Sequence, residues 1–175
     1  MTRRVILDAN AMTAAIRQMA TDILAGSNGA AGLALIGVHT RGIPIADRLA
    51  QAIRDVQPGI SLDRGTVDIT LYRDDIESVP NPIVRGSEIT FDVSGKRIVL
   101  VDDVCFTGRT TRAAIDQIMD FGRPRVIELA VLVDRGHREL PIAPDWVGCR
   151  VETQRSEKVN VRLSETDGAD EVVVE

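Results

Sequence analysis

The chain has 175 residues, of which 44% are hydrophobic and only 3% aromatic. This length suits one globular domain with one core, so we expect a single domain over residues 1–175. The formal net charge is −5, which excludes a protein that binds nucleic acid through an overall basic surface. Arg nevertheless outnumbers Lys nineteen to two, and Arg is the better residue for bidentate contacts with phosphates and carboxylates.

The cysteine content indicates neither a zinc site nor a disulfide framework, and the apolar runs indicate no membrane segment. Cys105 and Cys149 are the only cysteines and form no C-x-x-C pattern. The first ten residues, MTRRVILDAN, contain an apolar run of three residues, too short for a signal peptide, and no stretch approaches the ~20 apolar residues of a membrane span. We therefore expect a cytoplasmic protein without membrane contacts.

The first elements along the chain are an amphipathic helix and a buried strand. Apolar residues recur at helical spacing from Met12 onwards, Asp8 or Asn10 can cap this helix, and Gly26 can end it. Residues 33–39, LALIGVH, then form a continuously apolar segment that is typical of a strand buried on both faces.

A short loop follows this strand and leads directly into a second helix. Thr40, Arg41 and Gly42 place a hydroxyl, a guanidinium and a glycine at the start of that helix, and Pro44 favours its first turn. Such a loop predicts a pyrophosphate site. Taken alone, the loop is better interpreted as an ordinary turn with a surface Arg, and the pyrophosphate interpretation gains weight only from the 98–110 segment described below.

Residues 66–73, TVDITLYR, alternate as a strand does and end at Arg73. Residues 74–94 follow without a regular pattern and include Pro80 and Pro82. A connection of this length is uncommon unless it is functional, so we predict a flexible lid over an active site. The alternative is a disordered or hairpin insertion.

Residues 98–110, IVLVDDVCFTGRT, form the most informative stretch. An apolar strand leads into Asp102 and Asp103, at the edge where open α/β sheets bind ligands. Thr107 and the residues after it then place a glycine, hydroxyls and amides at the start of a helix, which predicts a phosphate cradle. Carboxylates beside a phosphate cradle suit the hydroxyls of a ribose 5-phosphate, whereas an Asp pair alone would indicate only a solvated strand end.

Another buried strand is predicted over residues 125–134, and short β-like segments lie at 146–150, 158–163 and 171–175. Strands that alternate with helices predict an α/β fold with a central parallel sheet of four or five strands. The last segments are expected to supply the final strand and a small C-terminal hood, starting at about residue 135.

The 98–110 segment matches the phosphoribosyl pyrophosphate (PRPP) signature of the type I phosphoribosyltransferases. The chain also contains HTRG at 39–42, DITLYRDD at 68–75, GRPR at 122–125 and AVLVDRGHRELPI at 130–142. With these motifs it resembles the PyrR family, bifunctional regulators of the pyrimidine operon and uracil phosphoribosyltransferases. The resemblance runs from about residue 5 to the end of the chain.

The resemblance implies that uracil and PRPP are converted to UMP and diphosphate with Mg²⁺ held mainly through PRPP. It implies catalytic roles for Asp102, Asp103, Arg41 and Arg73, and a base site near Asp134, Arg135 and Val159. The implied PRPP and nucleotide site consists of Thr40, Arg41, Asp102, Asp103, Val104, Cys105, Phe106, Thr107, Gly108, Arg109 and Thr110. This chemistry needs no covalent nucleophile, so the Cys105 thiol is interpreted as a packing group.

The resemblance also implies a homodimer or higher oligomer that binds the leader mRNA of the pyrimidine operon, with UMP or UTP bound, and controls transcription by attenuation. Arg17, His137 and Arg138 are the candidate RNA contacts. Ala143 and Cys149 stand where many family members carry basic residues, which weakens this prediction because RNA binding depends on phosphate neutralisation. Three functions stay open: the uracil enzyme, an RNA-binding sensor with weak catalysis, and a phosphoribosyltransferase for another base.

Overall fold

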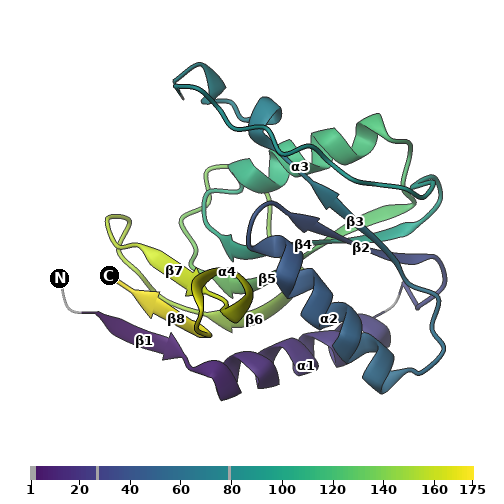
Figure 1. Ribbon diagram of the computed structural model, residues 1–175, viewed down its shortest axis with the longest axis horizontal. Helices are drawn as coiled ribbons and strands as arrows, with labels where there is room; N and C mark the ends of the chain where they lie inside the picture. The colour runs from purple at the N-terminus through teal and green to yellow at the C-terminus, as the bar shows by residue number, and fades with distance from the viewer. Residues whose placement is uncertain (1–2, 27, 79) are drawn as a thin grey trace.

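A five-stranded sheet, with strand order β3-β2-β4-β5-β6, forms the centre of the molecule (Figure 1). The computed structural model of the chain describes residues 3–26, 28–78 and 80–175. The predicted domain 1–175 and the predicted loop 74–94 each include residues outside this described part. All neighbouring strands are parallel, as expected. The strands are β2 (Leu33–Val38), β3 (Asp63–Val67), β4 (Arg97–Cys105), β5 (Val126–Asp134) and β6 (Trp146–Arg150).

Helices cover both faces of this sheet. α1 (Ala9–Ala25) and α2 (Gly42–Val56) lie on one face, and α3 (Arg109–Asp120) lies on the other (Figure 1). Alternate residues of each central strand join two separate apolar clusters: Leu35 packs with α1 and α2, whereas its neighbour Ile36 packs with α3. This burial on both faces explains why the central strands are continuously apolar.

The predicted ends of α1 are confirmed. The Asp8 carboxylate accepts a hydrogen bond from the amide of Ala11 at 2.8 Å, and Gly26 stands at the C-cap. This bond satisfies one of the amides that a helix leaves unpaired at its start. No helix of the described residues is both long and apolar enough to cross a membrane.

A second, antiparallel sheet with strand order β1-β8-β7 forms the hood. It consists of β1 (Arg4–Leu7), β7 (Val159–Arg162) and β8 (Glu171–Val174), with the short helix α4 (Ser164–Asp167) between the last two. As expected, one of the last segments, β6, supplies the final strand of the parallel sheet. The hood boundary at about residue 135 stays a prediction. The hood also includes the N-terminal strand, which pairs with β8 at the other end of the chain.

The strand predicted over residues 66–73 is wrong at both ends. β3 begins at Asp63 and ends at Val67, and a short 3-10 helix, η1 (Thr70–Tyr72), follows. The Asp68 carboxylate accepts hydrogen bonds from the amide and the hydroxyl of Thr70 at 3.0 and 2.5 Å, and this local turn ends the strand.

The loop after this turn is tied back to β3. It contains a second 3-10 helix, η2 (Ile76–Ser78), and returns to form an antiparallel bridge in which Thr66 and Glu88 exchange two backbone hydrogen bonds of 2.8 and 2.9 Å. Figure 1 shows η1 and η2 extending beyond α3, away from the sheet. The expected mobility of residues 74–94 stays a prediction.

Candidate active site

The two predicted phosphate loops lie side by side at the carboxyl edge of the parallel sheet. β2 pairs with β3 on one side and with β4 on the other. The next strand along the chain after β3 is thus added on the opposite side of β2, which makes this the switch point of the parallel sheet. Ligands of open α/β sheets bind at such switch points. Gly42 allows the close approach: a Cβ at this position would lie 2.4 Å from the carbonyl oxygen of Val101.

A cavity of about 380 Å³ opens between these loops. The sequence predicted seven of its lining residues: Thr40, Arg41, Arg73, Asp102, Asp103, Val104 and Thr110. It missed Asp68 and Arg85, which also line the cavity. Asp68 begins the DITLYRDD motif, which is the one signal that could have found it. The cavity therefore combines carboxylates, guanidiniums and hydroxyls, the groups that a sugar phosphate needs.

The two adjacent carboxylates differ in their surroundings. Asp102 is only 8% exposed, whereas Asp103 is half-buried. Each accepts the amide of the next residue: Asp102 Oδ1 from Asp103 N at 2.9 Å, and Asp103 Oδ1 from Val104 N at 2.8 Å. Burial, reinforced by the charge of Asp103, raises the pKa of Asp102 well above its ordinary value. A ligand that donates hydroxyl hydrogen bonds here would relieve this unfavourable burial of charge.

The predicted phosphate cradle opens α3. Gly108 stands at the N-cap with a φ of 91°, a left-handed conformation that favours glycine. The amide of Arg109 donates to Thr107 Oγ1 at 3.3 Å, and its guanidinium pairs with Asp74 and Glu139 at 2.6 and 2.8 Å. The Arg109 side chain is thus engaged with two carboxylates, and the amides at the start of the helix are the groups that suit a phosphate.

Cys105 and Phe106 contribute to the packing of this loop. The Cys105 side chain belongs to the apolar cluster beneath α3, and burial raises its thiol pKa to about 11. The Cys105 side chain is thus buried among apolar groups, in line with its interpretation as a packing group. The guanidinium of Arg135 lies 4.0 Å from the centre of the Phe106 ring, and the His137 ring meets that ring edge-on at 5.7 Å.

The hood contacts the first phosphate loop through Arg41. Its guanidinium donates to both Asp167 oxygens, at 2.8 and 3.3 Å, and this contact lowers the pKa of Asp167 well below its ordinary value. An adjoining cavity of about 290 Å³ is lined by Val159 together with Arg41, Asp103 and Asp167. The structure thus places the predicted base contact Val159 next to the carboxylate and Arg of the main site.

The other two predicted base contacts line a different cavity. Asp134 and Arg135 surround a space of about 660 Å³ with His137 and residues 150–153. Arg135 is buried, and its Nη2 donates to the carbonyl of Gln154 at 3.0 Å. The three residues assigned to the base therefore do not share one cavity, and Val159 is the one that lines a cavity together with Asp103.

Arg138 is not a free cation, because its guanidinium is engaged within the protein. Its assignment as an RNA contact stays a prediction. Its guanidinium donates to Asp134 Oδ1 at 2.5 Å, to the carbonyl of Phe106 at 2.7 Å and to the carbonyl of Ile142 at 3.0 Å. His137 is engaged as well, because its Nε2 lies 2.7 Å from the carbonyl of Thr153. These bonds join the phosphate loop to the segment after β5, so Arg138 supports the site from behind.

Replacing Arg138 by Ala is therefore expected to destabilise the protein by about 1–3 kcal/mol and to reduce its activity, because several carbonyls and Asp134 would lose their donor. Urea unfolding followed by circular dichroism measures the first effect. Arg54→Ala, at an exposed position of α2, is the control. A stable Arg138→Ala variant with unchanged activity would show that these hydrogen bonds do not support the site.

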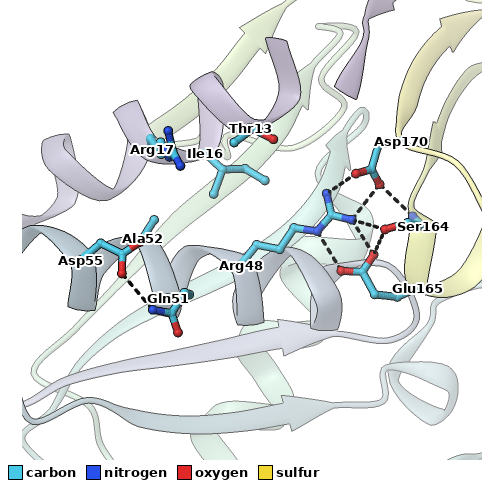
Figure 2. Close-up of a pocket in the computed structure, with 10 residues that line it drawn as sticks. All are labelled: Thr13, Ile16, Arg17, Arg48, Gln51, Ala52, Asp55, Ser164, Glu165 and Asp170. Carbon is cyan, nitrogen blue, oxygen red and sulfur yellow. Dashed lines mark hydrogen bonds and ion pairs between the residues drawn. The ribbon is translucent and has the colours of Figure 1, made fainter. Parts of the chain in front are cut away.

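The third RNA candidate, Arg17, lies elsewhere, on the exposed side of α1. Figure 2 shows the cavity of about 410 Å³ that it lines with residues of α2 and of the hood. In the same cavity, Arg48 reaches from α2 to the hood, where it bonds to Ser164 at 3.0 Å, to Asp170 at 2.7 Å and to Glu165 at 2.5 Å (Figure 2). The three RNA candidates thus do not form one basic face.

Comparison with known proteins agrees with this geometry. The family model described as the phosphoribosyl transferase domain matches residues 3–166. A hypoxanthine phosphoribosyltransferase of Trypanosoma cruzi aligns with a TM-score of 0.74 and 17% identity, covering 98% of this chain and 95% of that chain. A hypoxanthine-guanine phosphoribosyltransferase of Bacillus anthracis gives 0.74 and 15%, with 97% and 96% covered. The fold is thus that of a phosphoribosyltransferase.

Similarity in sequence narrows this class. Proteins named Bifunctional protein PyrR from Thermus thermophilus and Halalkalibacterium halodurans are 53% and 49% identical to this chain. The alignments cover 95% and 98% of this chain, and 92% and 97% of those proteins. The chain belongs to the family of bifunctional PyrR proteins.

Proposed function

We propose that this protein transfers the ribose 5-phosphate group of PRPP to N1 of uracil, forming UMP and pyrophosphate, and that it also regulates pyrimidine genes by binding their leader mRNA. The observation that carries the enzymatic half is the shared cavity of Thr40, Arg41, Asp102 and Asp103. This cavity supports the proposal, because the loop proposed for pyrophosphate and the two carboxylates proposed to accept ribose hydroxyls border one space.

In the proposed mechanism, amides and hydroxyls of residues 107–110 hold the 5-phosphate, while Asp102 and Asp103 accept hydrogen bonds from the ribose hydroxyls. The C1–O bond of PRPP breaks with its electron pair moving to pyrophosphate, the N1–C1 bond forms, and the N1 proton leaves to solvent. Positive charge grows on the ribose beside the carboxylates. Negative charge grows on the pyrophosphate beside Arg41 and Arg73. The residues thus stabilise both charges without a covalent intermediate.

The implied Mg²⁺ fits this donor set. Asp102 and Asp103 offer carboxylate oxygens, which are hard ligands of the kind that Mg²⁺ prefers. Among the described residues, no group of three or more His, Cys, Asp or Glu side chains gathers as a metal site. The ion would therefore be held mainly by PRPP oxygens, with at most these carboxylates in support. When bound, it supplies positive charge that favours the departure of pyrophosphate.

The uracil assignment is tested by mixing the protein with PRPP and Mg²⁺ and with uracil, hypoxanthine, guanine or orotate in turn. Chromatography of the nucleotide products should show UMP with uracil and no comparable product with the other bases. The family relationship supports this outcome, while the structural neighbours supply the competing one. Faster formation of a purine nucleotide would show that the protein is a phosphoribosyltransferase for another base.

The regulatory half of the proposal rests on family membership, because the structure engages His137 and Arg138 internally and leaves Arg17 as the exposed candidate. We propose that a homodimer or higher oligomer binds the RNA, since paired surfaces would double the phosphate contacts. A cytoplasmic location belongs to the same proposal. A gel shift with the leader mRNA, with and without UMP at ~50 mM salt where ionic contacts are strong, is expected to show UMP-dependent binding. The absence of a shift under these conditions would reject RNA binding, and the enzymatic activity would be the only proposed function that stands.

A further inference from the structure

Three guanidiniums border the cavity between β2 and β4, and they differ in how their charge is compensated. Arg41 is paired with Asp167 at 2.8 Å, and Arg73 is paired with Asp75 at 2.7 Å. In residues 3–26, 28–78 and 80–175, Arg85 makes no ion pair within 4.0 Å. Its Nη1 makes one long hydrogen bond, to Thr40 Oγ1 at 3.4 Å. Arg85 is thus the guanidinium of this cavity whose charge is not already matched by a carboxylate.

The backbone at Arg85 is held in place by the buried Asp68. One Asp68 oxygen accepts the amides of Arg85 and Gly86, the latter at 3.0 Å, while the other accepts Thr70. In addition, the amide of Asp68 donates to Ser87 Oγ at 2.8 Å. Burial alone would raise the pKa of Asp68, but the hydrogen bonds outweigh it and lower the pKa to about 2. The carboxylate is therefore ionised at neutral pH, and the loop stays fastened at the cavity.

We infer that Arg85 is a further residue that binds the pyrophosphate group, and that Asp68 is the positioning residue that holds it there. This inference rests on the proposed function and assigns one more contact in the same site. The hydrogen bond to Thr40 places the guanidinium beside the loop assigned to pyrophosphate, and a guanidinium can donate two parallel N–H bonds to a phosphate.

The three Arg residues differ in the partner that each must release before it can bind the pyrophosphate. Arg41 and Arg73 must loosen an ion pair before they can turn fully to a ligand, whereas Arg85 gives up only a long bond to a neutral hydroxyl. As the C1–O bond breaks, negative charge accumulates on the pyrophosphate. The hydrogen bonds that Arg85 donates to it therefore strengthen in the transition state and raise kcat as well as affinity.

The test compares Arg85→Gln, Arg85→Lys and the control Arg54→Gln on the full chain. Calorimetry measures the binding of pyrophosphate with Mg²⁺ and, separately, of UMP. Arg85→Gln is expected to weaken pyrophosphate binding roughly ten- to hundredfold, to lower kcat/KM for PRPP and to change UMP binding by less than about twofold. Arg85→Lys should recover part of the loss, because it keeps the charge but not the fork of donors.

Asp68→Asn tests the positioning role. It is expected to weaken pyrophosphate binding less than Arg85→Gln does, and the double variant should bind no more weakly than Arg85→Gln alone, because both changes remove the same contact. A general loss of structure would instead make the two effects add. If Asp68→Asn fails to fold, as thermal unfolding would reveal, the comparison of Arg85→Gln with Arg85→Lys still decides the role of Arg85.

The outcomes separate this inference from the proposed function. Pyrophosphate binding by Arg85→Gln equal to that of the wild type, or an equal loss of UMP binding, would overturn the role of Arg85 while UMP synthesis by the wild type still supported the enzyme. Weaker pyrophosphate binding by Arg85→Gln, in a protein that makes no UMP from uracil, would uphold Arg85 and reject the uracil assignment.

Discussion

Replacing Asp102 and Asp103 together by Asn is expected to lower UMP synthesis at least roughly a thousandfold. Both side chains line the cavity of the two phosphate loops, where their charges would stabilise the positive charge that develops on the ribose. Asn keeps the size of each side chain and one acceptor oxygen, so substrate can still enter while the charge is lost. Radiolabelled uracil and PRPP, with product counted after separation, measure this effect. A double variant with wild-type turnover would refute the assignment.

Replacing Asp102 alone by Asn is expected to make the unliganded protein more stable at neutral pH. Burial, followed by the charge of Asp103, raises the pKa of Asp102 above its ordinary value of 3.8. Above pH 3.8 the unfolded chain releases this proton while the folded protein retains it, so stability falls as the pH rises through the interval up to the raised pKa. Asn does not ionise, and Asp102→Asn avoids this loss.

Thermal unfolding between pH 5 and pH 8 tests this sign. The Tm of Asp102→Asn should exceed that of the wild type at pH 8, and the difference should shrink as the pH is lowered. Asp116→Asn, at an exposed position of α3, is the matched control and should show no such trend. Equal Tm values of Asp102→Asn and the wild type over the whole range would mean that Asp102 carries no unfavourable charge.

Arg97→Met is expected to destabilise the protein by about 3–5 kcal/mol, the largest stability effect that we predict. Arg97 is fully buried at the start of β4 and donates to Glu128 Oε2 at 2.7 and 3.1 Å. It also donates to the carbonyls of Ile23 and Gly29, at 3.0 and 2.5 Å. Glu128 in turn accepts the Trp146 indole at 3.0 Å. Without Arg97, the Glu128 charge would stay buried and lose its main partner.

Urea unfolding should reveal this loss, and Tm should fall by roughly 6–20 °C. The double variant Arg97→Met with Glu128→Gln should recover much of it, because the uncompensated charge is then removed. Arg162→Met, which breaks an exposed ion pair with Glu171, should change stability by less than about 1 kcal/mol. If Arg97→Met lowered stability as little as Arg162→Met does, the buried pair would not hold together the amino-terminal edge of the parallel sheet.

The central sheet could be predicted because its signals are local. Continuous apolar runs such as residues 33–38 mark strands buried on both faces, and the cap at Asp8 marks the start of α1. β1 was missed because four residues, Arg4–Leu7, carry too little signal, and their partner strand β8 lies at the opposite end of the chain. Pairing over such a separation is set by the completed fold and not by local propensity.

The residues of the active site, too, were predicted where their signal is local and missed where the completed fold brings them together. Asp102 and Asp103 were predicted because their motif is contiguous. Arg85 was not, because it reaches the cavity through a hydrogen bond from its amide to Asp68, 17 positions earlier in the chain. Arg138 was predicted only as a candidate RNA contact, with a solvated loop as the alternative. The sequence does not reveal that the carbonyls of the phosphate loop converge on its guanidinium.

A crystal structure of the protein with UMP tests the central claim most directly. We expect the phosphate on the amides and hydroxyls of residues 107–110, the ribose hydroxyls on Asp102 and Asp103, and the uracil ring beside Val159. This pose would show that the cavity between β2 and β4 holds the nucleotide as the proposed reaction requires. UMP bound in the cavity of Asp134 and Arg135, with Asp102 and Asp103 free of the ribose, would contradict the account.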